Sequence, residues 1–100
     1  MLIIAGTFTF DPDKLDDVVA LQAPLVEEVR AEAGCQEYVF TIDPHEPGTQ
    51  RLFEIWDDED SLAAHARAPH MVAYRAAMQE LGAMRSREVR LFEVSGDRSL

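Results

Sequence analysis

The segment QEYVFTIDPHEPGTQRLFEIWD, residues 36–57, predicts a β-hairpin and thereby decides the fold. Tyr38, Phe40 and Ile42 alternate along QEYVFTID, as expected for a strand with one buried face. The segment PHEPGTQ contains two prolines and one glycine, which favour a turn, and the strand RLFEIWD follows it directly. These two strands therefore form a hairpin at the centre of the chain.

The segment before the hairpin predicts a strand followed by a helix. Residues 2–10, LIIAGTFTF, are rich in β-branched and aromatic residues and read as a strand. Asp11 can cap a helix and Pro12 suits its first turn. An apolar stripe with helical spacing then runs to Val29, and Gly34 is expected to end the helix. Pro24 predicts a kink or a local break near residues 20–24.

The segment after the hairpin predicts a broken helix and a last strand. DDEDSLAAHARAPHM is acidic at its start, as a helix N-terminus favours, and Pro69 predicts a break before a restart at His70. A stripe at spacings of three and four continues the helix through Met71, Tyr74, Met78 and Leu81. Residues 87–94, REVRLFEV, predict a fourth strand, and SGDRSL a frayed tail.

The resulting order, β-α-β-β-α-β, predicts an α+β protein with the ferredoxin-like arrangement and an antiparallel sheet. One hundred residues are enough for one hydrophobic core and too few for two. We therefore expect one domain over residues 1–94 and a C-terminal tail over residues 95–100.

Composition and charge exclude several classes of partner. Apolar residues make up 47% of the chain, which predicts a folded protein. A net charge of −10 with scattered basic residues argues against nucleic acid and against an anionic membrane surface. Without a spanning segment or a signal peptide, the expected location is cytoplasmic. Cys35, the only cysteine, is expected to be a small buried hydrophobe.

Several predicted strands carry apolar residues on both faces, as in the pairs Leu2 and Ile3, Phe53 and Trp56, and Leu91 and Phe92. A sheet of this kind needs a second covering layer, which this chain is too short to supply. A homodimer packed sheet to sheet would supply it.

The candidate catalytic residues are Glu54, Trp56 and His65. Strand alternation places Glu54 and Trp56 on one face, and helical spacing places His65 on the side of Leu62. If both faces meet the core, Glu54 can orient His65 as a general base. The alternative is structural, because a buried Glu–His pair also fastens a helix to a sheet.

The other two histidines have weaker indications. His70, at the proline break, either binds substrate or only caps the restarted helix, and His45 is expected in an exposed turn. His65 and His70 are five residues apart, which does not fit the i, i+4 spacing of helical zinc motifs. The break at Pro69 weakens this argument, but no metal is expected. Met71, Tyr74 and Met78 are expected to pack in the core or to line a pocket for a flat aromatic ligand.

Residues 34–81 resemble the antibiotic biosynthesis monooxygenase family, including its quinol monooxygenase branch. The resemblance rests on a GC-x-x-Y strand, a D-P-x-x-P-G turn, an E-x-W strand and a D-x-x-x-L-x-x-H helix that runs into a P-H turn. The flanking segments agree with the family in order and length.

The resemblance implies a dimeric α+β barrel that oxidises a quinol or polyphenol with O₂ and uses no cofactor. It also implies that His65 acts as base, Glu54 orients it and Trp56 forms a stacking wall. Relatives that use an Asn beside the Trp differ, since this chain has no Asn, which counts against haem degradation. A noncatalytic ligand-binding or stress-response dimer and a haem-binding protein are the alternative functions.

Overall fold

The computed structural model describes residues 1–100 as four strands and three α-helices. In chain order they are β1 (Leu2–Phe10), α1 (Leu15–Arg30), β2 (Cys35–Ile42), β3 (Thr49–Trp56), α2 (Glu59–Arg67), α3 (Pro69–Leu81) and β4 (Met84–Glu93). A short 3-10 turn, Pro12–Lys14, precedes α1, and Asp11 caps it by accepting a hydrogen bond from the Asp13 N–H.

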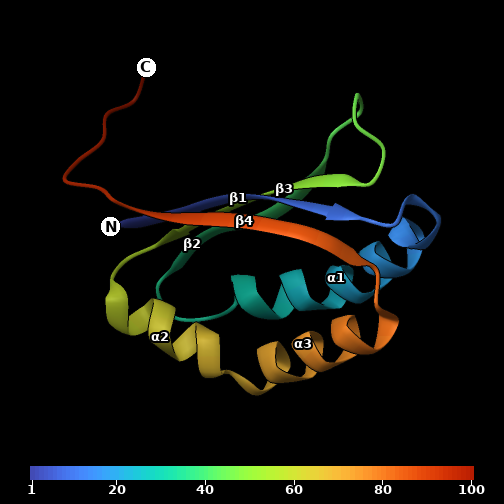
Figure 1. The fold of residues 1–100 in the computed structure, drawn as a ribbon. Helices are drawn as coiled ribbons and strands as arrows, with labels where there is room; N and C mark the ends of the chain where they lie inside the picture. Colours follow the sequence, from blue (N-terminus) through green and yellow to red (C-terminus); the bar gives the residue numbers. More distant parts are fainter.

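The strands form one sheet in the order β2-β3-β1-β4, and every neighbouring pair is antiparallel. All three helices lie against the same face of this sheet, and the other face carries no covering element (Figure 1). The predicted ferredoxin-like α+β fold is therefore confirmed. No helix has both the length and the apolar character needed to span a membrane.

The structure corrects several predicted boundaries, including that of the last strand, which begins at Met84 rather than at residue 87. α1 continues through Pro24 without a break, and it ends at Arg30 rather than at Gly34. Buried contacts of Val18, Leu25 and Val29 stabilise the helix around the proline, which costs about 3 kcal/mol in a helix interior. The break before α3 is present, but α3 begins at Pro69 rather than at His70.

The core lies between the helices and the inner face of the sheet. Because side chains alternate along a strand, Leu2, Phe8 and Phe10 of β1 point inward together and are buried. On β3 the register pairs Leu2 with Trp56 and Ile4 with Glu54, so Glu54 and Trp56 also face the helices. The predicted orientation of these two site residues is thus the observed one.

The outer face of the sheet is apolar at one end. Ile3 of β1 lies between Ile55 of β3 and Phe92 of β4, and the next row contains Phe53 and Ala5. Phe92 keeps 41% of its surface exposed. The two-faced apolar character expected from the sequence is therefore present.

Candidate functional site

Glu54 and Trp56 are buried together on β3. Trp56 has no exposed surface, and its indole N–H donates a hydrogen bond of 2.8 Å to Glu54 Oε1. Burial raises the pKa of the Glu54 carboxyl, although the Trp56 hydrogen bond and the nearby His65 oppose this shift. Trp56 also lies against the His65 ring, with the centroids 4.6 Å apart. Its aromatic face is therefore already in contact with protein.

His65 has a different principal partner from the predicted one. Its Nδ1 lies 2.8 Å from Glu32 Oε2, at hydrogen-bond distance, whereas its Nε2 lies 4.0 Å from Glu54 Oε1. Glu54 and His65 are thus brought together, as the sequence predicted, but without a hydrogen bond. Glu32 is the carboxylate that holds the imidazole.

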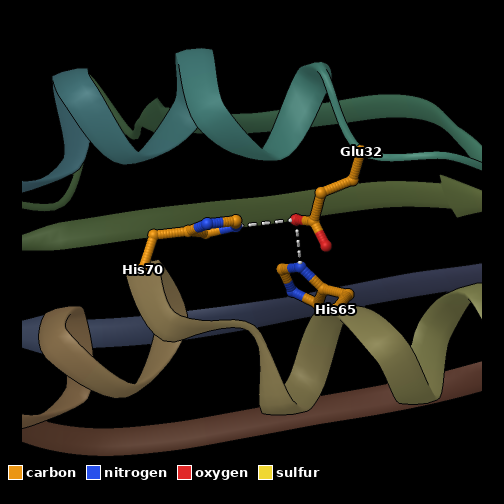
Figure 2. A group of neighbouring side chains, drawn as sticks. All are labelled: Glu32, His65 and His70. Atoms are coloured by element: carbon orange, nitrogen blue, oxygen red, sulfur yellow. Dashed lines mark hydrogen bonds and ion pairs between the residues drawn. The ribbon is translucent and has the colours of Figure 1, made fainter.

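His70 joins the same carboxylate. Its Nε2 lies 3.0 Å from Glu32 Oε2, so a single oxygen contacts both imidazoles (Figure 2). Its Nδ1 lies 3.3 Å from Glu28 Oε2. The sequence had separated His70 from His65, whereas the structure joins them. We refer to Glu32, Glu54, His65 and His70 as the carboxylate–histidine cluster.

Two local features bring the cluster together. Glu32 lies in the turn between α1 and β2, and Gly34 ends that turn with φ of 82°, a conformation that favours glycine. A Cβ at Gly34 would collide with the Ser61 side chain, so the glycine lets the first turn of α2 approach. Asp58 caps α2 by accepting the Ser61 N–H, and Pro69 redirects the chain so that His70 faces Glu32.

Glu32 was not among the candidate residues from the sequence. It follows the last turn of α1, outside the helical stripe, and the chain contains 19 acidic residues. The only sequence feature that could have identified Glu32 is its position two residues before Gly34, in the predicted turn that leads into the hairpin. That feature does not distinguish Glu32 from its acidic neighbours.

A separate pocket of about 390 Å³ lies between α3 and the sheet. Of the four predicted substrate-binding residues, Met71, Tyr74 and Met78 line it, whereas His70 does not. Its remaining lining residues are aromatic, apolar, basic or amide side chains: Phe8, Phe10, Phe40, Arg75, Gln79, Met84 and Arg87. No acidic residue lines this pocket, although the chain as a whole is strongly acidic.

The pocket and the cluster are neighbours that share no residue. Tyr38 connects them, because its ring packs edge-on against Phe40 of the pocket and against His65 of the cluster, at 5.5 Å in both cases. His70 instead lines a shallower surface hollow between α1 and α3. His70, which was predicted to bind substrate, therefore lies with the predicted catalytic residues, whereas Met71, Tyr74 and Met78 line the adjacent pocket.

The remaining candidate residues stay outside both regions. His45 is exposed in the hairpin turn, as expected from the sequence. Cys35 is half-buried at the start of β2. Burial, with the charges of Glu32 and Glu54, raises the pKa of its thiol, so Cys35 is a weak nucleophile at neutral pH.

Comparison with known proteins gives one family. Residues 1–77 match the model of the family described as antibiotic biosynthesis monooxygenase. The chain is also 26% identical over 99 residues to the uncharacterized protein sll1783 of Synechocystis sp.. The aligned region covers 99% of this chain and 67% of that protein.

Solved structures show the same architecture. The structure of Rv0793 from Mycobacterium tuberculosis is 28% identical, with a TM-score of 0.85 and 98% of each chain covered. A protein from Deinococcus radiodurans is 21% identical, with a TM-score of 0.89, and covers 100% of this chain and 98% of its own. At that identity the second likeness shows the fold alone.

Proposed function

The chain belongs to the antibiotic biosynthesis monooxygenase family, and on this basis we propose that it oxidises a quinol-like or polyphenolic aromatic substrate with O₂ and no cofactor. The observation that carries the proposal is the pocket beside α3. Its aromatic and thioether lining suits a flat ring, and Arg75 and Arg87 favour a phenolate over the neutral phenol.

The proposed reaction needs no external reductant. Loss of a phenolic proton raises the electron density of the ring until it can reduce O₂. One oxygen atom then forms a C–O bond to the ring and the other leaves as water. A hydroquinone that becomes a hydroxyquinone supplies all the electrons, because both the diol and one ring C–H bond are oxidised. The protein has to bind the ring, take the proton and stabilise the charge.

We propose His65 as the group that takes the proton. Glu32 can accept the Nδ1–H of His65, which leaves the Nε2 lone pair free on the side of Trp56 and Glu54. Glu32 rather than Glu54 then has the orienting role, and Glu54 faces the imidazolium that forms. The substrate has to enter beside Tyr38 for its hydroxyl to approach Nε2.

Oxygen uptake with a panel of hydroquinones tests the binding part of this proposal. Met71→Trp fills the pocket, so kcat/KM should fall by about 100-fold or more. Val72→Trp places the same ring at the next residue of α3, which is exposed, and should stay near wild type. Equal loss in both variants would contradict the assignment of this pocket.

The role of His65 is tested in the same assay. His65→Gln should lower kcat by about 100-fold or more, whereas His45→Gln, in the exposed turn, should not change it. If wild type binds hydroquinone but consumes no O₂, the noncatalytic ligand-binding alternative replaces the oxidation. If His65→Gln keeps full turnover, His65 has only a structural role.

The homodimer is part of the same proposal. Its support is the apolar row of Ile3, Ile55 and Phe92 on the uncovered sheet face. Phe92→Arg should convert a dimer to a monomer in light scattering, and a wild-type monomer would contradict this interface. The cytoplasmic location stays a prediction, which cell fractionation would test.

A further inference from the structure

Three potential metal ligands from three separate segments converge within the carboxylate–histidine cluster. Glu32 comes from the turn after α1, His65 from the last turn of α2, and His70 from the first turn of α3 (Figure 2). One ligand atom from each residue lies within 4.8 Å of the other two. Two imidazoles and one carboxylate form a common donor set for divalent transition metals.

We propose that Glu32, His65 and His70 bind a divalent transition-metal ion of the Zn²⁺ class, an activity beyond the proposed oxidation. The ligand atoms would be Glu32 Oε2, His65 Nδ1 and His70 Nε2. Water completes the coordination, since His70 keeps 23% of its side chain exposed and leaves a path to solvent.

The spacing of the ligand atoms suits this assignment. Glu32 Oε2 lies 2.8 Å from His65 Nδ1 and 3.0 Å from His70 Nε2. Zinc–ligand distances of about 2.0–2.2 Å require ligand atoms roughly 3.0–3.5 Å apart, so each imidazole has to move only a few tenths of an ångström from Glu32. The two imidazole nitrogens lie within 4.8 Å of each other, and the ion would have to hold them at the same spacing. His70 has room for this adjustment because it begins a new helix after the Ala68 break.

The outer partners of the two imidazoles are an independent observation for a metal. The far nitrogen of each ring faces a second carboxylate: His65 Nε2 lies 4.0 Å from Glu54 Oε1, and His70 Nδ1 lies 3.3 Å from Glu28 Oε2. Metal-bound histidines commonly donate their second ring N–H to a carboxylate. Here both carboxylates lie near the far nitrogens at ion-pair distance, without a hydrogen bond. The three acids also create a negative potential that attracts a cation.

Metal binding and proton acceptance exclude each other at His65. A metal on Nδ1 leaves the proton on Nε2, so the ring has no lone pair for a phenolic proton. Bound Zn²⁺ should therefore inhibit quinol oxidation. This consequence rests on the proposed function, whereas the metal site itself does not.

Titration of EDTA-treated protein tests the site directly. Calorimetry with Zn²⁺ and the visible absorption of Co²⁺ should both report one ion per chain in the wild type. Glu32→Gln and His70→Gln should each weaken binding by about 10-fold or more. His45→Gln removes an exposed imidazole outside the cluster and should bind as the wild type does.

The opposite outcomes are equally clear. If the wild type binds neither ion stoichiometrically, or if Glu32→Gln binds as the wild type does, the proposal is overturned and the cluster serves only to hold the two histidines on Glu32 by hydrogen bonds. Far-ultraviolet circular dichroism identifies variants that fail to fold. If Glu32→Gln does not fold, His70→Gln, at a half-buried position, still tests the site. An inactive wild type that still binds Zn²⁺ would contradict the oxidation only.

Discussion

The pocket and the carboxylate–histidine cluster lie side by side in the same layer but are built by opposite means. The pocket is enclosed by apolar side chains of regular elements, mainly the α3 stripe and the inner face of β1 and β2. The cluster depends on irregular positions, namely the turn after α1 and the break before α3. Regular periodicity thus makes a binding cavity, and the interruptions of that periodicity bring the ionisable groups together.

The largest expected effect comes from Trp56, which supports the cluster. Trp56→Ala removes a fully buried ring and the only hydrogen-bond donor to buried Glu54, so the free energy of unfolding should fall by about 3–5 kcal/mol. Met71→Ala should cost only about 1 kcal/mol, because that side chain is half-buried beside the pocket. Urea unfolding measures both values.

Equal losses in these two variants would show that the cluster is no more important to stability than the pocket wall. If Trp56→Ala does not fold, Trp56→Phe retains a ring but lacks the N–H. Its loss should still exceed that of Met71→Ala, because Glu54 stays buried without its donor.

A smaller effect is expected at Tyr74, which belongs to the pocket wall. Gln22 Nε2 donates to the Tyr74 hydroxyl at 3.3 Å and to Gln50 Oε1 at 2.8 Å. Tyr74→Phe removes the longer of these bonds and should lower the free energy of unfolding by about 0.5–1.5 kcal/mol. Val72→Ala, exposed on the same helix, should stay within about 0.5 kcal/mol. A loss at Tyr74 no larger than at Val72 would show that the bond contributes nothing.

The α3 residues that line the pocket could be placed on one face from the sequence because they follow a repeating pattern, although the sequence left open whether they form a pocket or only pack in the core. Met71, Tyr74 and Met78 recur at spacings of three and four, and a helix places them on one side whatever lies opposite. The inward direction of Glu54 and Trp56 follows from strand alternation in the same way. These expectations depend only on local geometry, and in the structure each of these side chains lies on the predicted face.

The cluster could not be predicted, because its contacts depend on how turns fold. No periodic rule applies to Glu32, which reaches His65 across 33 positions of sequence. The spacing argument that separated His65 from His70 applies to one continuous helix, and the predicted break at Pro69 weakened it without showing how the two helices are oriented. At Pro24 the sequence predicted a break that is absent, because the packing of α1 on the sheet outweighs the local cost of the proline.

The smallest expected effect uses Cys35 to measure the charge of the cluster. Burial and the charges of Glu32 and Glu54 raise the pKa of its thiol, so less thiolate is present at pH 8 and alkylation by iodoacetamide should be slow. In metal-free protein, Glu32→Gln removes one of these charges and lowers that pKa, which should speed the reaction by a few-fold. Glu37→Gln removes a charge on the outer face of the sheet and should leave the rate unchanged.

The alkylation rate of Cys35 can also detect zinc in the cluster. A cation held by Glu32, His65 and His70 would oppose the negative charge near Cys35, so Zn²⁺ should speed alkylation in the wild type but not in Glu32→Gln. Acceleration in both proteins would indicate zinc bound elsewhere, for instance by the thiol. If the alkylation rate responds to Glu32→Gln but not to Zn²⁺, the cluster carries charge and holds no metal. The cluster would then differ from the pocket only in having groups that can take up a proton.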